Sequence, residues 1–175
     1  MTDGRLDLAA KVRDIPDFPK EGILFRDIMP LLQDAKALRE AVDRLVEYGT
    51  GKHVDLVMGA EARGFILGAA MAYGLGAGFV CARKPGKLPH DVVSAEYALE
   101  YGTDRLEVHA DAIKPGQRVL VHDDLLATGG TARAKIELVE KLGGVVAGVA
   151  FIIELSALNG REKLEGYDIF SLITY

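Results

Sequence analysis

The residues best suited to chemistry lie in VLVHDDLLATGGT, residues 119–131, where an apolar run ends in two adjacent carboxylates. Asp123 and Asp124 repel one another in a buried setting, so they need hydrogen-bond donors or cations as partners. A sugar cis-diol supplies two O–H donors side by side, and carboxylates bind ribose hydroxyls in dinucleotide-binding folds. The acidic pair therefore predicts a site for a ribose.

The segment after the acids has the composition of an anion-binding loop. Its two glycines allow backbone N–H groups to turn towards an anion, and threonine hydroxyls and a helix N-terminus also favour phosphate. In a simpler interpretation the segment is a tight turn whose Thr131 only caps the helix, which leaves the two acids unexplained. We expect a 5′-phosphate to bind at Ala127, Thr128, Gly129, Gly130 and Thr131.

Strands and helices alternate in the hydrophobic pattern around this loop. Such alternation favours an α/β fold, with a mostly parallel sheet covered by helices on both faces. The length of 175 residues predicts a single domain, 1–175. Residues 84–105 hold many turn formers and are interpreted as a long functional loop. The expected strands are 54–58, 78–82, 118–122 and 145–153, and the expected helices are 6–12, 37–48, 64–76 and 131–142.

Basic residues follow two of the expected strands at the point where each strand ends. Because the carboxyl ends of parallel strands meet at one edge of a sheet, we expect these cations to gather beside Asp123. Arginine and lysine at such an edge suit the oxygens of a diphosphate, although each alone is ordinarily a solvated surface charge. The four cations are Arg63, Arg83, Lys84 and Lys87.

A proline-stiffened segment, residues 15–32, presents one aromatic ring, Phe25, beside Arg26 and Asp27. A planar base needs a stacking face and hydrogen bonds at its edge, and backbone groups can supply the latter. Without the other motifs Phe25 would be interpreted as a core residue. Together with them, the segment predicts a base-binding site.

These motifs resemble a known family. Acid-acid-x-x-x-Thr-Gly-Gly-Thr after an apolar strand resembles the phosphoribosyl diphosphate signature of the type I phosphoribosyltransferases, and EARGF and KPGKLP are similar to the adenine-specific members. The resemblance runs from about residue 12 to Tyr175, with the motifs in family order. It implies the type I phosphoribosyltransferase-like fold and a purine salvage reaction, transfer of the 5-phosphoribosyl group to N9 of adenine, giving AMP and diphosphate. His122 stands where the family usually has an apolar residue, and we interpret it as a core histidine.

The resemblance also implies roles for individual residues. Asp123 and Asp124 hold the ribose hydroxyls, and the four cations contact the diphosphate. Phe25 stacks on adenine, opposite an aliphatic residue, while main-chain groups of its two neighbours read the base edge. Residues 84–109, with SAEYALEYGTDRLEVH, resemble the flexible hood that excludes water. The implied adenine-binding residues are Leu24, Phe25, Arg26 and Leu155, and the implied catalytic residues are Glu100 as acid/base, Tyr101 over the sugar, and Arg63.

Cofactor, partners and compartment follow in the same way. The resemblance implies Mg²⁺ bound through substrate oxygens and water without a direct protein ligand, and a homodimer in which one cation is supplied across the interface. A net charge of −5 disfavours a broad basic face for nucleic acid, and no apolar run is long enough to span a membrane. The single cysteine, Cys81, cannot form an internal disulfide, which favours the cytoplasm.

Two alternatives remain open at this stage. One is a phosphoribosyltransferase-fold regulator that senses nucleotides and binds nucleic acid, although the complete set of cations argues against it. The other is a phosphoribosyltransferase for xanthine or an orotate-like base. A charged base-reading residue opposite Phe25 would distinguish that enzyme.

Overall fold

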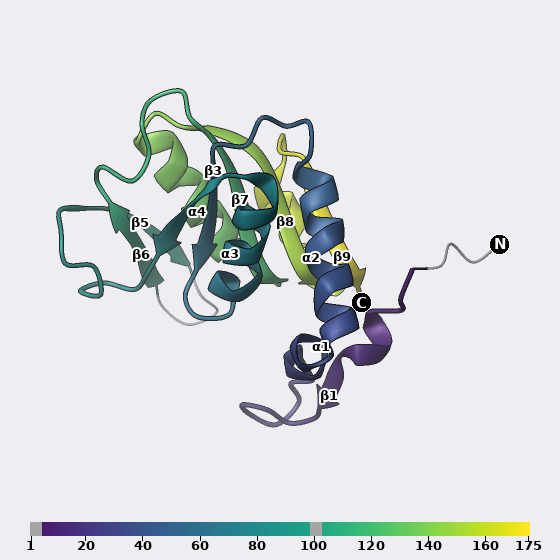
Figure 1. Ribbon diagram of the computed structural model, residues 1–175. Helices are drawn as coiled ribbons and strands as arrows, with labels where there is room; N and C mark the ends of the chain where they lie inside the picture. The colour runs from purple at the N-terminus through teal and green to yellow at the C-terminus, as the bar shows by residue number, and fades with distance from the viewer. Residues whose placement is uncertain (1–4, 99–102) are drawn as a thin grey trace.

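Five parallel strands in the order β4-β3-β7-β8-β9 form the central sheet of the computed structural model, which describes residues 5–98 and 103–175 (Figure 1). The central strands are apolar along most of their length, as strands covered on both faces must be. The parallel sheet predicted from the sequence is therefore confirmed. Its strands are β3 (Leu56–Ala60), β4 (Gly78–Ala82), β7 (Arg118–Leu126), β8 (Val145–Glu154) and β9 (Ile169–Thr174).

Helices cover the two faces of this sheet (Figure 1). Because successive strand residues point to opposite faces, Val57 packs with helices α2 and α3, whereas Met58 packs with helix α4. The three main helices agree with the sequence pattern to within two residues at each end. They are α2 (Ala35–Gly49), α3 (Gly64–Leu75) and α4 (Gly130–Lys141), and a short helix, α1 (Met29–Gln33), precedes them.

The segment interpreted as a loop over 84–105 is in large part an antiparallel ribbon, so that interpretation is wrong. Strand β5 (Val92–Ala98) pairs with β6 (Thr103–His109), and the ribbon packs on α4. One face of the ribbon places Ala95 and Leu106 in the core, whereas the other carries the exposed Glu96 and Arg105 and a buried carboxylate, Glu107. A half-buried ribbon alternates apolar and polar residues, so it lacks the continuous apolar run that identified the sheet strands.

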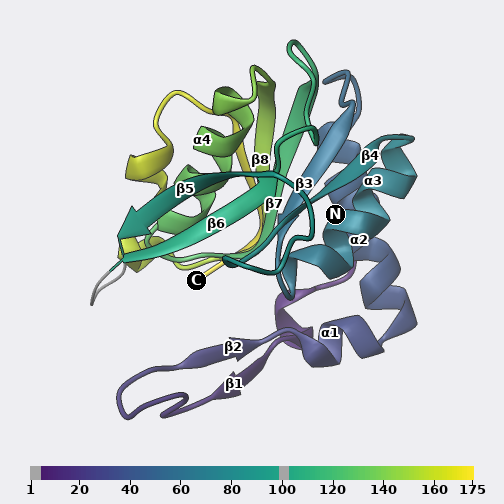
Figure 2. The ribbon, with the colours of Figure 1, turned by 90° about the vertical axis from the view of Figure 1, so that its left-hand side faces the viewer.

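A hairpin of β1 (Arg13–Ile15) and β2 (Phe25–Asp27) projects from the body of the molecule (Figure 2). The helix expected at 6–12 is only a 3-10 turn, Ala9–Lys11, because Val12 is already extended and leads into β1. The last strand, β9, was not predicted from the sequence. Within the described ranges, 5–98 and 103–175, none of the helices has the length and apolar character needed to cross a bilayer.

Strand β7 continues through the acidic pair instead of ending at His122. Asp123 and Leu125 still pair with β8, so the two acids lie within the sheet near its carboxyl edge. Adjacent residues of a strand point to opposite faces. The two carboxylates therefore have different surroundings, which shapes the candidate site.

Candidate active site

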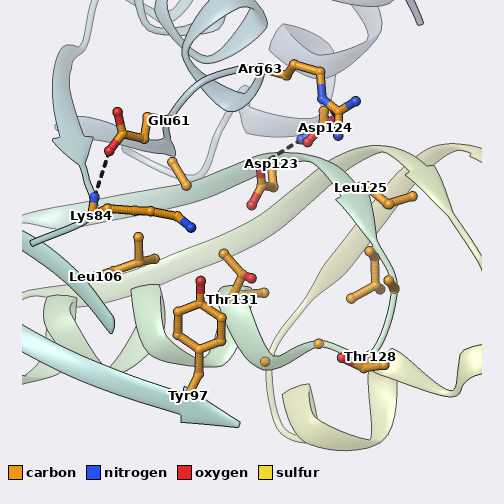
Figure 3. A pocket seen from close by; sticks show the side chains of 16 residues that line it. Glu61, Arg63, Lys84, Tyr97, Leu106, Asp123, Asp124, Leu125, Thr128 and Thr131 are labelled. Carbon is orange, nitrogen blue, oxygen red and sulfur yellow. Dashed lines mark hydrogen bonds and ion pairs between the residues drawn. The ribbon is translucent and has the colours of Figure 1, made fainter. Parts of the chain in front are cut away.

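Asp123 and Asp124 each have a different cationic partner. The buried Lys135 of α4 places its Nζ 2.7 Å from Oδ2 of Asp123. On the other side of the strand, Nε of Arg63 lies 2.6 Å from Oδ2 of Asp124 (Figure 3). Two adjacent carboxylates are thus balanced by two cations, one from α4 and one from the turn before α3, which meets the requirement that a buried acidic pair have partners.

Burial shifts the titration of one member of the pair. Desolvation raises the pKa of Asp124 to about 6, and the neighbouring Asp123 carboxylate adds to the rise. The positive charges of Arg63 and Lys135 oppose it. Asp124 is therefore protonated in mild acid and becomes a charged hydrogen-bond acceptor above about pH 6.

A polar cavity of about 260 Å³ opens between the ends of β3 and β7 and the start of α4 (Figure 3). It contains both acids and the whole segment predicted to hold a 5′-phosphate. Helix α4 begins with Gly129 as its N-cap and no side-chain cap, so the N–H groups of its first turn remain for an anion. The lining includes Glu61, Arg63, Lys84, Tyr97, Asp123, Asp124, Ala127, Thr128, Gly129, Gly130 and Thr131.

Gly129 is required by the geometry of this loop. Its φ is +80°, and a Cβ on it would stand 2.4 Å from the carbonyl oxygen of Gly160. Only glycine adopts this conformation freely and permits so close a backbone approach. The Gly-Gly pair thus packs the loop tightly while leaving its inner side open to the cavity.

The four predicted cations do not all face this cavity. Arg63 and Lys84 line it, whereas Arg83 and Lys87 line a separate cavity of about 410 Å³. Arg83 donates from Nε and Nη2 to Oε2 of Glu61, at 3.1 and 2.9 Å. The expectation that all four gather beside Asp123 is therefore corrected. Neighbouring residues of an extended chain alternate in direction, so Arg83 and Lys84 cannot both point into one cavity.

Glu61 connects the two groups of cations. Its Oε1 accepts from the backbone N–H of Lys84 at 2.7 Å (Figure 3). Its Oε2 accepts from Arg83. The Lys84 hydrogen bond, followed by the Arg83 contact, lowers the pKa of Glu61. Glu61 was not predicted as a site residue, although it stands two positions before Arg63 in EARGF.

The ribbon, which belongs to the segment 84–109 that resembles the hood, forms a wall of the polar cavity through Tyr97, a residue that was not predicted as a site residue. Tyr97 of β5 lines the polar cavity, and its hydroxyl donates to Oδ2 of Asp104 at 3.1 Å. The same carboxylate oxygen lies 3.1 Å from Nζ of Lys84. Lys84 is thereby held at the cavity by a residue of β6. The predicted residues Glu100 and Tyr101 lie outside the residues that the structure describes.

A second, mainly apolar cavity of about 210 Å³ adjoins the first. Arg63, Asp124, Leu125 and Ala127 line both, so they form the common wall. The Arg63 guanidinium carbon lies 5.1 Å from the centre of the Phe25 ring. The structure brings together here all four residues predicted for adenine, Leu24, Phe25, Arg26 and Leu155.

The charged side chain of Arg26 is engaged outside this cavity. It forms an ion pair with Asp14, and its guanidinium carbon lies 3.8 Å from the centre of the Tyr175 ring. Besides Arg26, the charged lining residues are Arg63 and Asp124, which are paired with each other. Leu155 stands on the β8 side of the cavity, so a charged base-reading residue is not found at that position.

His122 is fully buried, as expected of a core histidine. Its Nδ1 lies 3.0 Å from the carbonyl oxygen of Ala150 on β8. Burial lowers the pKa of His122 to about 4, so the ring is neutral near pH 7. It lines neither of the two cavities of the candidate site.

Comparison with known proteins gives consistent results. The phosphoribosyl transferase domain model matches residues 28–173. An adenine phosphoribosyltransferase of Thermotoga neapolitana is 62% identical over 170 residues, covering 97% of this chain and 100% of that protein. A crystal structure of the enzyme of that name from Thermoanaerobacter pseudethanolicus has a TM-score of 0.94 at 55% identity, covering 96% and 98% of the two chains.

A more distant structure contains ligands. The adenine phosphoribosyltransferase of Saccharomyces cerevisiae, complexed with D-2,5-dideoxy-2,5-imino-altritol 1,6-bisphosphate and adenine, has a TM-score of 0.89 at 40% identity. The match covers 94% of this chain and 96% of that one. The similarity to all three relatives thus extends over nearly their full lengths.

Proposed function

Since this chain belongs to the adenine phosphoribosyltransferase family, we propose that its two adjoining cavities bind the two substrates of that reaction. The enzyme transfers the 5-phosphoribosyl group from phosphoribosyl diphosphate to adenine in purine salvage, giving AMP and diphosphate. One observation carries the assignment of the cavities. A polar cavity with an acidic pair and an anion loop shares a wall with an apolar cavity that contains an aromatic ring.

The donor occupies the polar cavity in this proposal. Asp123 and Asp124 accept hydrogen bonds from the ribose 2′- and 3′-hydroxyls, and these bonds are strong because the acceptors are charged. The 5′-phosphate lies against the first turn of α4, where backbone N–H groups and the hydroxyls of Thr128 and Thr131 surround it. The sugar is thereby held with its anomeric carbon towards the second cavity.

Arg63 and Lys84 contact the diphosphate, because they are the two lysine or arginine side chains in the described lining of the polar cavity. They stabilise negative charge as the bond from the anomeric carbon to the diphosphate oxygen breaks. Two cations also neutralise part of the charge of the bound donor before reaction, and the fork of arginine suits two phosphoryl oxygens.

The donor set of the chain fits Mg²⁺ that is held by substrate and water. Asp123 and Asp124 are already paired with cations, and residues 5–98 and 103–175 contain no cluster of three or more metal-ligating side chains. Mg²⁺ commonly keeps its waters and binds substrate phosphates. When bound, it supplies further charge neutralisation of the diphosphate.

Adenine occupies the apolar cavity and stacks on Phe25, with Leu155 on its other face. Main-chain groups of Leu24 and Arg26 read the base edge. The side chain of Arg26 does not occupy that position, because it pairs with Asp14 outside the cavity. N9 attacks the anomeric carbon from the face opposite the leaving diphosphate, so the configuration of that carbon inverts. From the family resemblance, Glu100 accepts the adenine proton and Tyr101 closes over the sugar to exclude water.

A homodimer is the assembly we propose. Helix α3 exposes two large apolar side chains, Tyr73, which is 90% exposed, and Ile66, which is 45% exposed. Contiguous exposed apolar surface commonly marks an interaction site. Arg83 and Lys87 line the neighbouring cavity, so a second copy over this face would place them at the boundary between the copies.

Sedimentation equilibrium tests this assembly. We expect twice the chain mass for the parent protein and the mass of one chain for Tyr73→Glu, because a charge there opposes burial of the face. A parent protein that remains a monomer at the concentration of the assay would contradict the proposal.

The cytoplasm is the compartment we propose. The reaction uses phosphorylated substrates, and Cys81 has no second cysteine with which to form a disulfide within the chain. Reduced single cysteines are typical of cytoplasmic proteins.

One assay tests the substrate assignment. Purified protein is incubated with Mg²⁺, phosphoribosyl diphosphate and each of adenine, hypoxanthine, guanine and xanthine, and nucleotide formation is followed. We expect AMP from adenine and at most traces from the 6-oxopurines, because the apolar cavity offers no free charged group for an oxo edge. Nucleotide from hypoxanthine or xanthine but not from adenine would contradict the assignment of the base cavity.

A further inference from the structure

Lys135 is a fully buried lysine in the middle of α4. A buried ammonium group is unfavourable unless it is paired and hydrogen-bonded. Ile136, Leu138 and Val139 fill the neighbouring core positions of the same helix with apolar side chains. An apolar residue at position 135 would avoid the desolvation penalty, so the presence of lysine requires a specific explanation.

The contacts of Lys135 all lie at the acidic pair. Its Nζ donates to Oδ2 of Asp123 at 2.7 Å and to the carbonyl oxygen of His122, also at 2.7 Å. Lys135 itself does not line the polar cavity, whereas Asp123 does. The ammonium therefore approaches Asp123 from the helix side and acts on a substrate only through that carboxylate.

Two further groups restrict the same carboxylate. Its Oδ1 accepts from the backbone N–H of Asp124 at 3.0 Å. Across the strand, Gly64 approaches so closely that a Cβ on it would stand 2.8 Å from Oδ1. With Lys135 on Oδ2, both oxygens of Asp123 have fixed neighbours, and one orientation of the carboxylate is selected.

We propose that Lys135 is a positioning residue for the phosphoribosyl donor: it orients Asp123 towards the ribose hydroxyls and balances the charge of the acidic pair from outside the cavity. The proposal rests on the proposed function, because that function places the ribose at Asp123 and Asp124. Lys135 touches no substrate and acts through Asp123. It therefore affects the binding of the donor and the pH dependence of that binding, whereas adenine binding does not depend on Lys135.

The charges around the pair explain the second effect. Lys135 of α4 pairs with Asp123, and Arg63 of the loop before α3 pairs with Asp124. When all four groups are ionised, their net charge is zero. Lys135 also lowers the pKa of Asp124 against the effect of burial, so its removal shifts that pKa above about 6. The other ionisable groups nearby are Glu61, Lys84 and Tyr97, which line the cavity, and His122, which is buried and neutral near pH 7.

The test compares Lys135→Met with Lys141→Met in the full chain. Lys141 is a surface lysine on the same helix that pairs with Glu137 and donates to the carbonyl oxygen of Ser94. None of these three residues lines the polar cavity, so loss of Lys141 is the matched control. At pH 7 we expect the KM for phosphoribosyl diphosphate to rise about tenfold or more in Lys135→Met. This is the effect expected from the loss of one charge-assisted hydrogen bond. The KM for adenine should change by less than about twofold.

Calorimetric titration with ribose 5-phosphate between pH 5.5 and 9 supplies a readout independent of turnover. In the parent, affinity should rise through about pH 6, where Asp124 and the phosphate of the ligand both ionise, and then level off. The phosphate ionises alike with both proteins, so a difference between the two profiles reports Asp124. In Lys135→Met the Asp124 part of this rise should move to higher pH, because the nearby positive charge is lost. If Lys135 is needed only for folding, Lys135→Met would lower the unfolding temperature, and the rise in donor affinity would stay at the parental pH.

A double variant keeps the test decisive if Lys135→Met does not fold. Lys135→Met with Asp123→Asn contains no unpaired buried carboxylate, and it is compared with Asp123→Asn alone. Equal donor affinity in these two proteins supports action through Asp123, whereas a further tenfold loss overturns the proposal. A folded Lys135→Met with parental donor KM and pH profile also overturns it. By contrast, an Asp123→Asn variant with parental donor affinity would refute the ribose site itself.

Discussion

Replacing Asp124 by asparagine is expected to lower kcat/KM for phosphoribosyl diphosphate by about 10²-fold, the upper range for loss of a charge-assisted hydrogen bond. Asparagine keeps the size of the side chain but offers a neutral acceptor and an amide donor that cannot accept from a hydroxyl. It also leaves the guanidinium of Arg63 without its anionic partner at 2.6 Å. Steady-state kinetics with varied donor and saturating adenine measure this loss.

The same substitution is expected to stabilise the free protein at neutral pH. The pKa of Asp124 is raised from 3.8 to about 6 in the folded chain, mainly by burial. Folding therefore favours the protonated acid, and stability falls as pH rises from about 4 to about 6, with the full penalty above that range. One pKa unit corresponds to about 1.4 kcal/mol, so the penalty is at most about 3 kcal/mol.

Asparagine is neutral at every pH and removes this penalty, which already includes the attraction between Arg63 and Asp124. Arg63 is 36% exposed, so its guanidinium can turn to water. We expect a net gain of about 1 kcal/mol in the free energy of unfolding at pH 7.5. At pH 4 we expect none, because Asp124 is then protonated in the folded chain and is neutral like the asparagine that replaces it. Urea unfolding at the two pH values measures it. A variant that loses equal stability at both would show that Asp124 is not strained by its burial.

Such a gain would mean that the acidic pair is maintained for binding at the expense of stability. It also bears on what the sequence could predict. Asp123 and Asp124 were recognisable as a ribose site because two adjacent acids after a buried strand have few structural uses. Their unequal surroundings were not recognisable, because β7 was expected to end at His122 and in fact continues to Leu126.

Four of the five strands of the sheet were predictable because they are nearly continuous apolar runs, and parallel strands buried on both faces produce that pattern. The ribbon β5–β6 was not, because its exposed face interrupts each run with charged and small polar residues. The position of Tyr97 over the cavity depends on how this ribbon packs on α4, which local pattern does not specify.

The position of Lys135 illustrates a different failure. A lysine in a helix is ordinarily exposed. Here it is followed at helical spacing by Leu138 and Val139, which are buried, and preceded by Ala132, also buried. The signal available in the sequence was a lysine within the apolar stripe of the helix after an acidic pair. The role of this lysine depends on the contact between α4 and Asp123 of β7, which only the packed structure shows.

Replacing Arg63 by methionine should lower kcat by about 10²- to 10³-fold, the range for removing one group that stabilises charge in a transition state. Arg63 stands on the wall common to the two cavities. Its Nε lies 2.6 Å from Asp124, and its guanidinium carbon lies 5.1 Å from the centre of the Phe25 ring. One side chain thus adjoins the proposed ribose, base and diphosphate positions, where the bond to the leaving group breaks.

Lysine should restore little of this activity. A lysine at position 63 keeps the charge but not the planar fork that can hold Asp124 with one N–H and phosphoryl oxygens with others. We expect Arg63→Lys to remain at least about tenfold below the parent in kcat, since bidentate geometry is lost. Arg133→Met, which removes an exposed arginine of α4 that contacts Tyr167, should retain parental kinetics.

The division between kcat and KM identifies what Arg63 does. Loss of its charge also raises the pKa of Asp124, so the acid limb of donor affinity should move to higher pH in Arg63→Met. Measured above that limb, where Asp124 is ionised in both proteins, any remaining fall in kcat belongs to the leaving group. If kcat of Arg63→Met equals the parental value at pH 9, Arg63 acts by keeping Asp124 charged and does not stabilise the departing diphosphate.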